Sequence, residues 1–224
     1  MTAAHPVSMT ESITNMISRF LVFCSACLLA LNVAAAEAPD ALVKRVSEEV
    51  LEIVKQDQAI RNGDIKKITA LVDAKVLPHF DFQRMTALAV GRDWRAANAE
   101  QKKRLTEEFK ALLVRTYANA VTSYSNQKLV VKPLKMKAGE TEVLVRSEVL
   151  QPGAQPVQLD YWLEQQGDAW KVFDVVVAGI SLVTNYREQF AKEVRDNGID
   201  GLISTLAAKN KSLETSAAAK TARK

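Results

Sequence analysis

The spacing of the apolar residues changes twice along this chain of 224 residues, near position 128 and again near position 180. Before the first change they recur every three or four residues, which is typical of amphipathic helices. Between the two changes they alternate with polar residues, as Val145 does with Arg146, which is typical of half-buried strands. After the second change the helical spacing returns. The pattern therefore predicts an α+β fold rather than alternating strand–helix units.

Start and stop signals place the individual elements. Helices are expected to begin near Pro39, Ile65, Phe82, Asn98 and Ile180, with a short last helix over 199–206. Four strands are expected at 129–136, 141–150, 157–164 and 170–178. Because short turns join the strands, we expect a four-stranded antiparallel sheet between a helical N-terminal half and C-terminal helices that pack back on it.

The first 36 residues have the pattern of a secretory signal peptide. Arg19 precedes an apolar run, Phe20–Val33, that is too short for a comfortable transmembrane helix, and three alanines follow it. We expect cleavage after Ala36, with Met1 or Met16 as the start of translation. The alternative is an uncleaved membrane anchor.

The cysteines and histidines limit the chemistry of the exported chain. Cys24 and Cys27 lie in the apolar run, so residues 37–224 contain no cysteine and one histidine, His79. Thiol catalysis and metal sites built from cysteines or several histidines are thereby excluded. Neither a phosphate-binding glycine loop nor a G-x-S-x-G nucleophile elbow is present, and we expect no metal and no cofactor. Export without disulfides is typical of the bacterial periplasm.

One carboxylate stands out among the expected strands. Asp174 interrupts a run that is otherwise apolar, and a buried carboxylate must be paired or hydrogen-bonded. We expect a structural ion pair with Arg115, Arg146 or Arg187, and the alternative is a catalytic role. His79 follows a proline at a helix end and is expected to be a structural or surface histidine.

The domain organisation follows from the lack of internal repeats and long linkers. Residues 37–210 are expected to form a single domain and residues 211–224 a flexible basic tail. The basic run at 102–104 is followed one turn later by Glu107 and Glu108. Pairing within a helix therefore explains this run better than binding to nucleic acid.

Two stretches resemble the MlaC family of periplasmic phospholipid-binding proteins, also known for toluene tolerance. The first includes DFQRM at 81–85, LAVGRDW at 88–94 and LVRTYA at 113–118. The second is WKVFDVVVAGISLVTNYREQF at 170–190, followed by GIDGLI at 198–203. The resemblance covers roughly residues 40–210.

The resemblance implies a fold and a function. Members of the family carry phospholipid across the periplasm of Gram-negative bacteria, between an outer-membrane lipoprotein–porin complex and an inner-membrane ABC transporter that bears an MCE-domain protein. The implied fold has a strongly curved antiparallel sheet, as in NTF2-like proteins, with the lipid tails between sheet and helices and the headgroup near solvent. The implied activity is non-enzymatic, the bound phospholipid is cargo, and the transport maintains outer-membrane lipid asymmetry.

Inward-facing positions of the expected elements are the candidate lipid-binding residues, with ordinary core packing as the alternative for each. The strand candidates are Val143, Val145, Val149, Leu159, Tyr161 and Leu163. The helix candidates are Phe82, Met85, Leu88, Phe109, Leu113, Tyr117, Val183 and Tyr186.

Two other classes of function stay open at this point. One is an exported NTF2-like enzyme that acts on a small apolar substrate, with Asp174 or His79 as its base. The other is a module that only scaffolds envelope proteins and binds no lipid.

Overall fold

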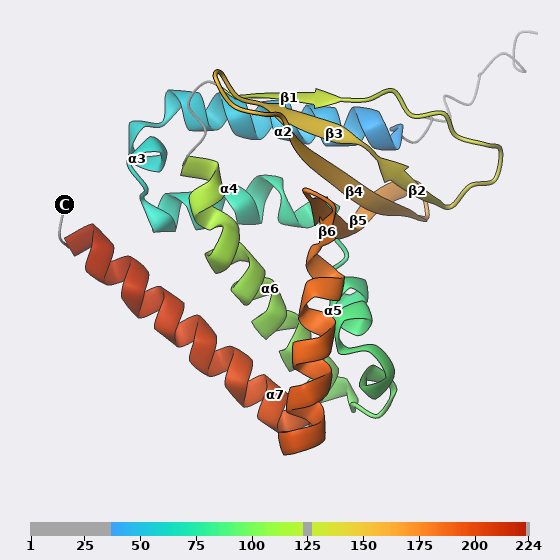
Figure 1. Ribbon diagram of the computed structural model, residues 1–224, viewed down its shortest axis with the longest axis vertical. Coiled ribbons are helices and arrows are strands. Elements are labelled where there is room, and N and C mark those ends of the chain that lie inside the picture. Colours follow the sequence, from blue (N-terminus) through green and yellow to red (C-terminus); the bar gives the residue numbers. More distant parts are fainter. Residues whose placement is uncertain (1–36, 123–126, 223–224) are drawn as a thin grey trace, which may run out of the picture. The chain divides into compact units, whose positions relative to one another are not determined.

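The computed structural model describes residues 37–122 and 127–222 (Figure 1). The expected signal peptide, its cleavage site and both cysteines lie outside the described residues. Within the described ranges, no helix is both long enough and apolar enough to cross a membrane.

The chain first forms a helical hairpin. Helix α2 (Pro39–Gln56) is followed by the short α3 (Gln58–Arg61), then by α4 (Ile65–Lys75) and the 3-10 turn η2 (Leu77–His79). The carboxylate of Asp57 accepts hydrogen bonds from the backbone N–H groups of Ala59 (2.8 Å) and Ile60 (3.2 Å) and so caps α3.

A second helical group begins after the turn. Helix α5 (Phe82–Val90) ends where the sequence predicts, and the 3-10 turn η3 (Gly91–Arg95) leads into α6 (Ala99–Thr122). The expected capping pair at the start of α6 is present. Asn98 N–H donates to Gln101 Oε1 (3.1 Å), and Gln101 N–H donates to Asn98 Oδ1 (2.9 Å).

The last helix, α7 (Leu182–Ala222), bends at Gly198, whose φ of 73° and ψ of −179° interrupt the helical backbone. Beyond this bend, helix continues well past the short segment predicted at 199–206 and through the described part of the stretch expected to be a flexible tail, 211–222. Asn210 Nδ2 donates to the carbonyl oxygen of Glu108 (2.9 Å), and Leu213 packs against the core of the helical group. These contacts hold the second half of α7 along α6.

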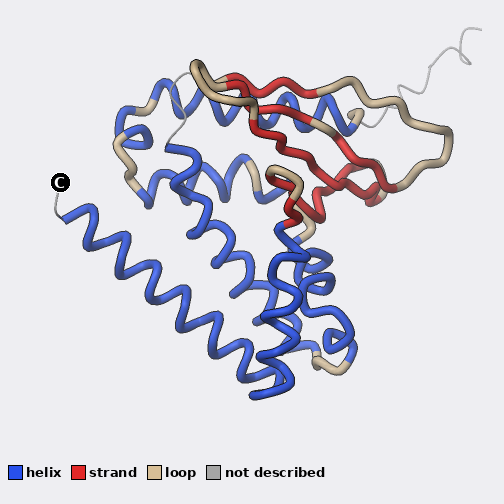
Figure 2. The backbone as a smooth tube through the Cα atoms, in the orientation of Figure 1, coloured by secondary structure: helices blue, strands red, loops and turns tan. Residues whose placement is uncertain are grey.

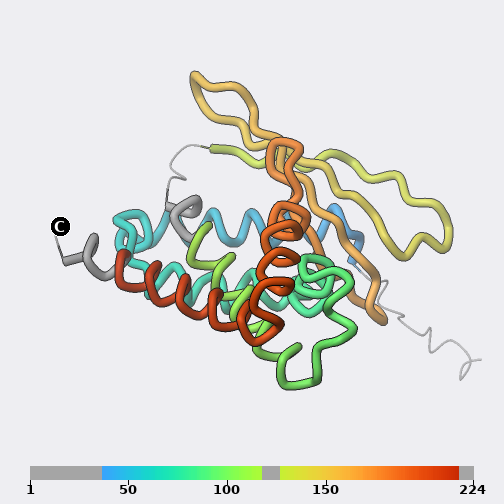
Figure 3. Tube along the Cα trace, turned by 60° about the horizontal axis from the view of Figure 1, so that its bottom comes forward, coloured from blue at the N-terminus to red at the C-terminus, as the bar shows by residue number. Residues whose placement is uncertain are grey.

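The sheet is antiparallel and keeps the predicted meander. Its strands are β1 (Lys128–Val131), β2 (Glu142–Val145), β3 (Ser147–Leu150), β4 (Val157–Gln166), β5 (Ala169–Val177) and β6 (Ile180–Ser181). The order is β1-β3-β4-β5-β6, and β2 also pairs with β4. The connections at 132–141 and 151–156 extend beyond the helices (Figure 3).

The sheet differs from the prediction at three places. The strand expected at 141–150 is divided at Arg146 into β2 and β3, both of which pair with β4. The first strand ends at Val131 rather than at 136, just before Pro133, which has no N–H to donate to a ladder. The two-residue strand β6 is not expected from the sequence.

A β-bulge in β5 puts Val172 and Val175, which are three residues apart, on the same face of the sheet. Leu163 of β4 pairs with Val172 and Trp162 pairs with Asp174, so Phe173 is the extra residue. Val172 and Val175 belong to the apolar cluster beneath α2, whereas Phe173 belongs to the cluster among α5, α6 and α7. Strand β5 therefore contributes side chains to both apolar clusters.

The apolar residues form three clusters. The largest lies among α5, α6 and α7, where Phe109 makes an edge-to-face contact with Phe190 at 5.2 Å between ring centroids. A second lies between α2 and the sheet, and a third between the end of α2, α3 and α4. Figure 2 shows the strands on one side, with α2 lying along them and the other long helices further away.

Candidate functional site

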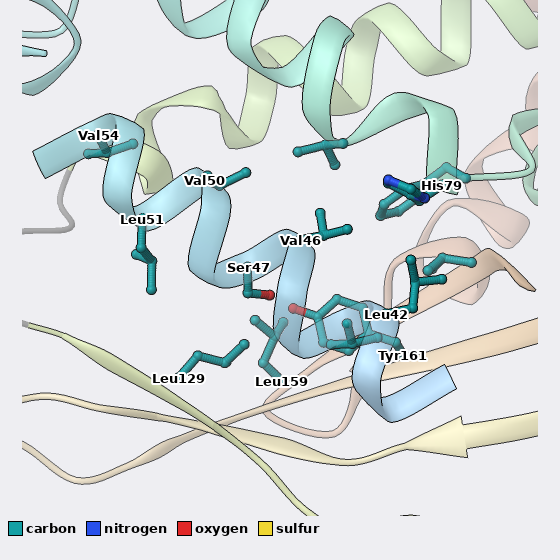
Figure 4. A pocket seen from close by; sticks show the side chains of 14 residues that line it. Leu42, Val46, Ser47, Val50, Leu51, Val54, His79, Leu129, Leu159 and Tyr161 are labelled. Carbon is teal, nitrogen blue, oxygen red and sulfur yellow. The ribbon is translucent and has the colours of Figure 1, made fainter. Parts of the chain in front are cut away.

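An apolar cavity of about 240 Å³ lies along α2 (Figure 4). It is lined by fourteen residues from helices, strands and the η2 turn. They are Leu42, Val43, Val46, Ser47, Val50, Leu51, Val54, Val76, His79, Phe80, Leu129, Leu159, Tyr161 and Val172. Most of them are half-buried, so the cavity communicates with solvent.

Half of the lining comes from one helix. The α2 residues form two adjacent rows with a spacing of four, Leu42–Val54 and Val43–Leu51, and side chains four apart lie one above the other on a helix. In Figure 4, Val46 and Val50 lie on the side of α4 and η2, whereas Ser47 and Leu51 lie on the side of the sheet. Helix α2 therefore presents an apolar surface wider than a single packing face.

The sheet supplies the second wall. Leu159 pairs with Val177 and Tyr161 pairs with Val175 in the β4–β5 ladder, which places Leu159 and Tyr161 on the same face because side chains alternate along a strand. Leu129 of β1 and Val172 of β5 complete this wall. The hydroxyl groups of Ser47 and Tyr161 point toward each other in Figure 4.

The cavity lies between two of the three apolar clusters. Leu42 and Val172 belong to the cluster under the sheet, and Val54 belongs to the cluster with α3 and α4. Protein interiors are normally packed as densely as organic crystals, so an apolar gap between two cores is available to an apolar ligand.

Only one side chain of the lining is ionisable near neutral pH. Burial lowers the pKa of His79, and the positive charges of Arg45 and Lys171 lower it further, while Glu37 and Glu49 act in the opposite direction. Arg45 itself forms ion pairs with Glu37 (2.7 Å) and Glu49 (3.1 Å), which raise the pKa of the guanidinium and lower the pKa values of both carboxyl groups.

The structure places only two of the sequence-predicted lipid-binding residues, Leu159 and Tyr161, on the wall of this cavity. Val143, Val145 and Leu163 are buried in the cluster under α2, and Val149 is buried in β3. The helix candidates lie elsewhere. Phe82, Met85, Leu88, Phe109, Leu113, Val183 and Tyr186 all belong to or pack against the α5–α6–α7 cluster.

Tyr117 is 38% exposed. Lipid contact at the candidates away from the cavity stays a prediction.

The sequence analysis missed the α2 residues and Val76, Phe80, Leu129 and Val172. The sequence does offer one signal for the α2 residues, because the apolar stripe of this helix is wider than packing against a single neighbouring element requires.

Asp174 is hydrogen-bonded rather than ion-paired, which corrects the expectation from the sequence. Its carboxylate accepts from Ser181 Oγ (2.5 Å), Val183 N–H (3.1 Å) and Val175 N–H (2.8 Å). Among the described residues it has no ion pair, and of the expected partners Arg115 pairs with Glu214 while Arg187 donates to the carbonyl oxygen of Leu88. Asp174 therefore anchors the start of α7 to β5.

Other kinds of site find little support. In the parts of the chain that the structure describes, no three His, Cys, Asp or Glu side chains are grouped so as to hold a metal ion. A second hollow of about 520 Å³ near Ile53 and Lys67 is lined mainly by polar residues and suits no apolar ligand.

Comparison with known proteins gives a consistent result. The family model described as MlaC protein matches residues 44–208. The chain is 26% identical over 191 residues to the intermembrane phospholipid transport system binding protein MlaC of Haemophilus influenzae, covering 83% of this chain and 89% of that protein. It is 39% identical over 107 residues to the toluene tolerance protein ttg2D of Pseudomonas putida, covering 47% and 49% of the two chains.

A solved structure extends the similarity to three dimensions. The phospholipid-binding protein of Ralstonia solanacearum, determined in complex with a phospholipid, superimposes with a TM-score of 0.74 at 39% sequence identity. The match covers 78% of this chain and 98% of that chain.

Proposed function

The chain belongs to the MlaC family, and from this we propose that it is a periplasmic carrier that holds phospholipid tails in the cavity beside α2. The observation that carries the proposal is an apolar cavity with no acidic, lysine or arginine side chain in its lining, in a fold similar to that of a protein solved with bound phospholipid. Phospholipid binding by that protein and the phospholipid transport named for the Haemophilus relative support the same reading.

The energetics of lipid transfer explain why such a cavity is needed. Exposing a methylene group to water costs about 0.8 kcal/mol, so one sixteen-carbon tail opposes leaving a bilayer by roughly 12 kcal/mol. A carrier must offset most of this cost with a dry apolar surface. The two rows of α2 and the facing residues of β1, β4 and β5 supply such a surface.

The size of the cavity suggests how loading proceeds. About 240 Å³ lies below the roughly 300–1,000 Å³ of typical ligand pockets, and a phospholipid with two tails needs more room. We propose that α2 moves away from the sheet as the tails enter. The polar attachment of the start of α2 includes the hydrogen bond from Leu134 N–H to Asp40 Oδ2 (3.2 Å), whereas Leu42 and Val43 meet the sheet through apolar contacts that are exchangeable for lipid.

The finer parts of the proposal concern partners and mechanism. The carrier would collect phospholipid at an outer-membrane lipoprotein–porin complex and release it at an inner-membrane ABC transporter with an MCE-domain protein. No covalent step is involved, the phospholipid is cargo rather than a cofactor, and the transporter would supply any ATP. The three hydrogen bonds to the Asp174 carboxylate support the non-enzymatic reading, because they occupy the group that an enzyme would use as its base.

Native mass spectrometry of the chain purified without detergent tests the proposal. We expect a mass excess of one or two phospholipids that is lost on denaturation and recovered in a lipid extract of the same sample. A chain that is purified empty and takes no phospholipid from liposomes would contradict the carrier function and favour a scaffold or a small-substrate enzyme.

A matched pair of variants locates the binding. Leu159→Trp fills the cavity from the sheet side and should lower the amount of bound phospholipid, whereas Leu150→Trp, at an exposed position of β3, should leave it unchanged. Equal loading of both variants would mean that the tails lie elsewhere in the fold.

A further inference from the structure

His79 differs chemically from the other residues that line the cavity. It is half-buried at the end of η2, and the other lining side chains are aliphatic or aromatic apart from the hydroxyl groups of Ser47 and Tyr161. Neither nitrogen of its imidazole has a hydrogen-bond partner within residues 37–122 and 127–222. The imidazole is therefore available to a ligand that carries a hydrogen-bond acceptor.

The fold brings positive charge to the same place. Phe80 forms an isolated parallel bridge with Val172, which sets the chain at 79–81 beside the chain at 171–173. The ammonium group of Lys171 donates to the carbonyl oxygen of Pro78, one residue from His79. No carboxylate pairs with Lys171 among the described residues, so its charge is not neutralised locally.

The start of α2 brings charges of both signs within electrostatic reach of His79. Arg45 of α2 acts on the imidazole together with Glu37 and Glu49, the two carboxylates that pair with Arg45. Each cation influences His79 more strongly than each glutamate does. The cations therefore lower the pKa of the imidazole more than the glutamates raise it, and the unpaired ammonium group of Lys171 favours an anionic ligand here.

We propose that His79 binds the phosphate of the phospholipid headgroup at the rim of the cavity, beside the ammonium group of Lys171. This proposal rests on the carrier function proposed above and adds a headgroup contact to it. In Figure 4, His79 lies across the cavity from Val46, close to the row of α2 residues that would flank a tail. A phosphate held there would leave the tails to extend along α2.

The proposal links lipid binding to protonation. A phosphate beside the imidazole favours its charged form and raises its pKa, whereas burial and the neighbouring cations lower it in the empty chain. By linkage, a chain that holds phospholipid takes up a proton more readily, so phospholipid should be retained more tightly as the pH falls through the titration of His79.

The test compares two lipids with the same acyl chains, a phosphatidylethanolamine and a diacylglycerol, which lacks the phosphate. We measure the affinity of the full chain for each lipid in competition against a fluorescent fatty acyl probe. The wild-type chain should prefer the phospholipid, and His79→Phe should reduce this preference by about 10-fold or more, the effect of losing a hydrogen bond to a charged group. His79→Gln should retain part of the preference and lose its dependence on pH.

NMR gives a second readout that does not depend on affinity. The full chain has two histidines, and the His79→Gln variant identifies which imidazole signal belongs to His79. The apparent pKa of His79 should be higher with phosphatidylethanolamine than with diacylglycerol. Inorganic phosphate alone should cause a much smaller shift, because no tail holds it at the rim.

The outcomes separate this inference from the carrier function. A wild-type chain that binds neither lipid would overturn the carrier function. A chain that binds phospholipid with the same preference in wild type and His79→Phe would overturn only the role of His79. An equal response to inorganic phosphate and to phospholipid would mean that the site binds free anions rather than a headgroup.

Discussion

Replacing Asp174 by asparagine should lower the free energy of unfolding by about 2–3 kcal/mol while leaving lipid binding intact. The carboxylate is 8% exposed and accepts hydrogen bonds from two backbone N–H groups and the Ser181 hydroxyl. An asparagine can keep its oxygen toward the two backbone N–H groups and turn its NH₂ group toward the Ser181 hydroxyl, but all three hydrogen bonds lose the negative charge. A hydrogen bond to a charged group contributes about 1.5–3 kcal/mol and a neutral one about 0.5–1.5 kcal/mol, so loss of the charge at these bonds and at the helix start accounts for the expected decrease.

Thermal unfolding followed by circular dichroism measures this effect. For a chain of this length the expected loss corresponds to a decrease in Tm of about 4–12 °C. Asp168→Asn is a matched control, because Asp168 lies exposed in the turn between β4 and β5. If Asp174→Asn and Asp168→Asn unfold at the same Tm, the anchoring role of Asp174 is refuted. Loss of lipid binding in a variant that still folds would refute the separation between this anchor and the cavity.

Three further predictions follow from other contacts. Arg84→Lys should lower the free energy of unfolding by about 1–2 kcal/mol in urea titrations. The reason is that the guanidinium stacks on Phe173 at 3.7 Å and pairs with Glu142 and Glu164 of the sheet. An unchanged urea midpoint would show that the stacking contributes nothing. Gly198→Ala should destabilise the chain by about 1–3 kcal/mol in the same assay. The cause is backbone strain at a φ of 73°, because no neighbouring atom lies close enough to clash with the added methyl group. A neutral effect would mean that the bend straightens. The lipid-free chain should lose stability as pH falls below about 6.5, because the folded state lowers the pKa of His79 and so disfavours its protonation. In His79→Gln the Tm should depend less on pH between about 7.5 and 5.5. An equal dependence of Tm on pH in both proteins would assign the loss to other groups.

The sequence predicts elements well where a local signal is strong. The capping pair Asn98–Gln101 marks the start of α6, and the alternation in β2 and β4 places Val143 and Leu163 on one face, where they pair. The bulge at Phe173 could not be found in this way. Residues around it are apolar on both faces, so the sequence carries no alternation that would break at the extra residue.

The candidate site was harder to predict because periodicity identifies a buried face but not its partner. The stripe from Leu42 to Val54 predicts α2, yet whether that stripe meets a tight core or a cavity depends on how closely the sheet and α4 approach it. Met85 and Phe109 have equally clear helical spacing and lie in a packed core instead. Voids result from the mutual fit of distant elements, which no local pattern records.

Photo-crosslinking with a phospholipid that carries a diazirine near the end of one acyl chain tests most directly whether the tails occupy the cavity beside α2. After irradiation of the loaded chain and proteolysis, we expect labelled peptides from α2, within Leu42–Val54, and from β4 around Leu159 and Tyr161. An excess of unlabelled phospholipid should abolish this labelling. Labelling confined to α5 and α6, near Met85 and Phe109, would contradict this location and place the tails in the other core.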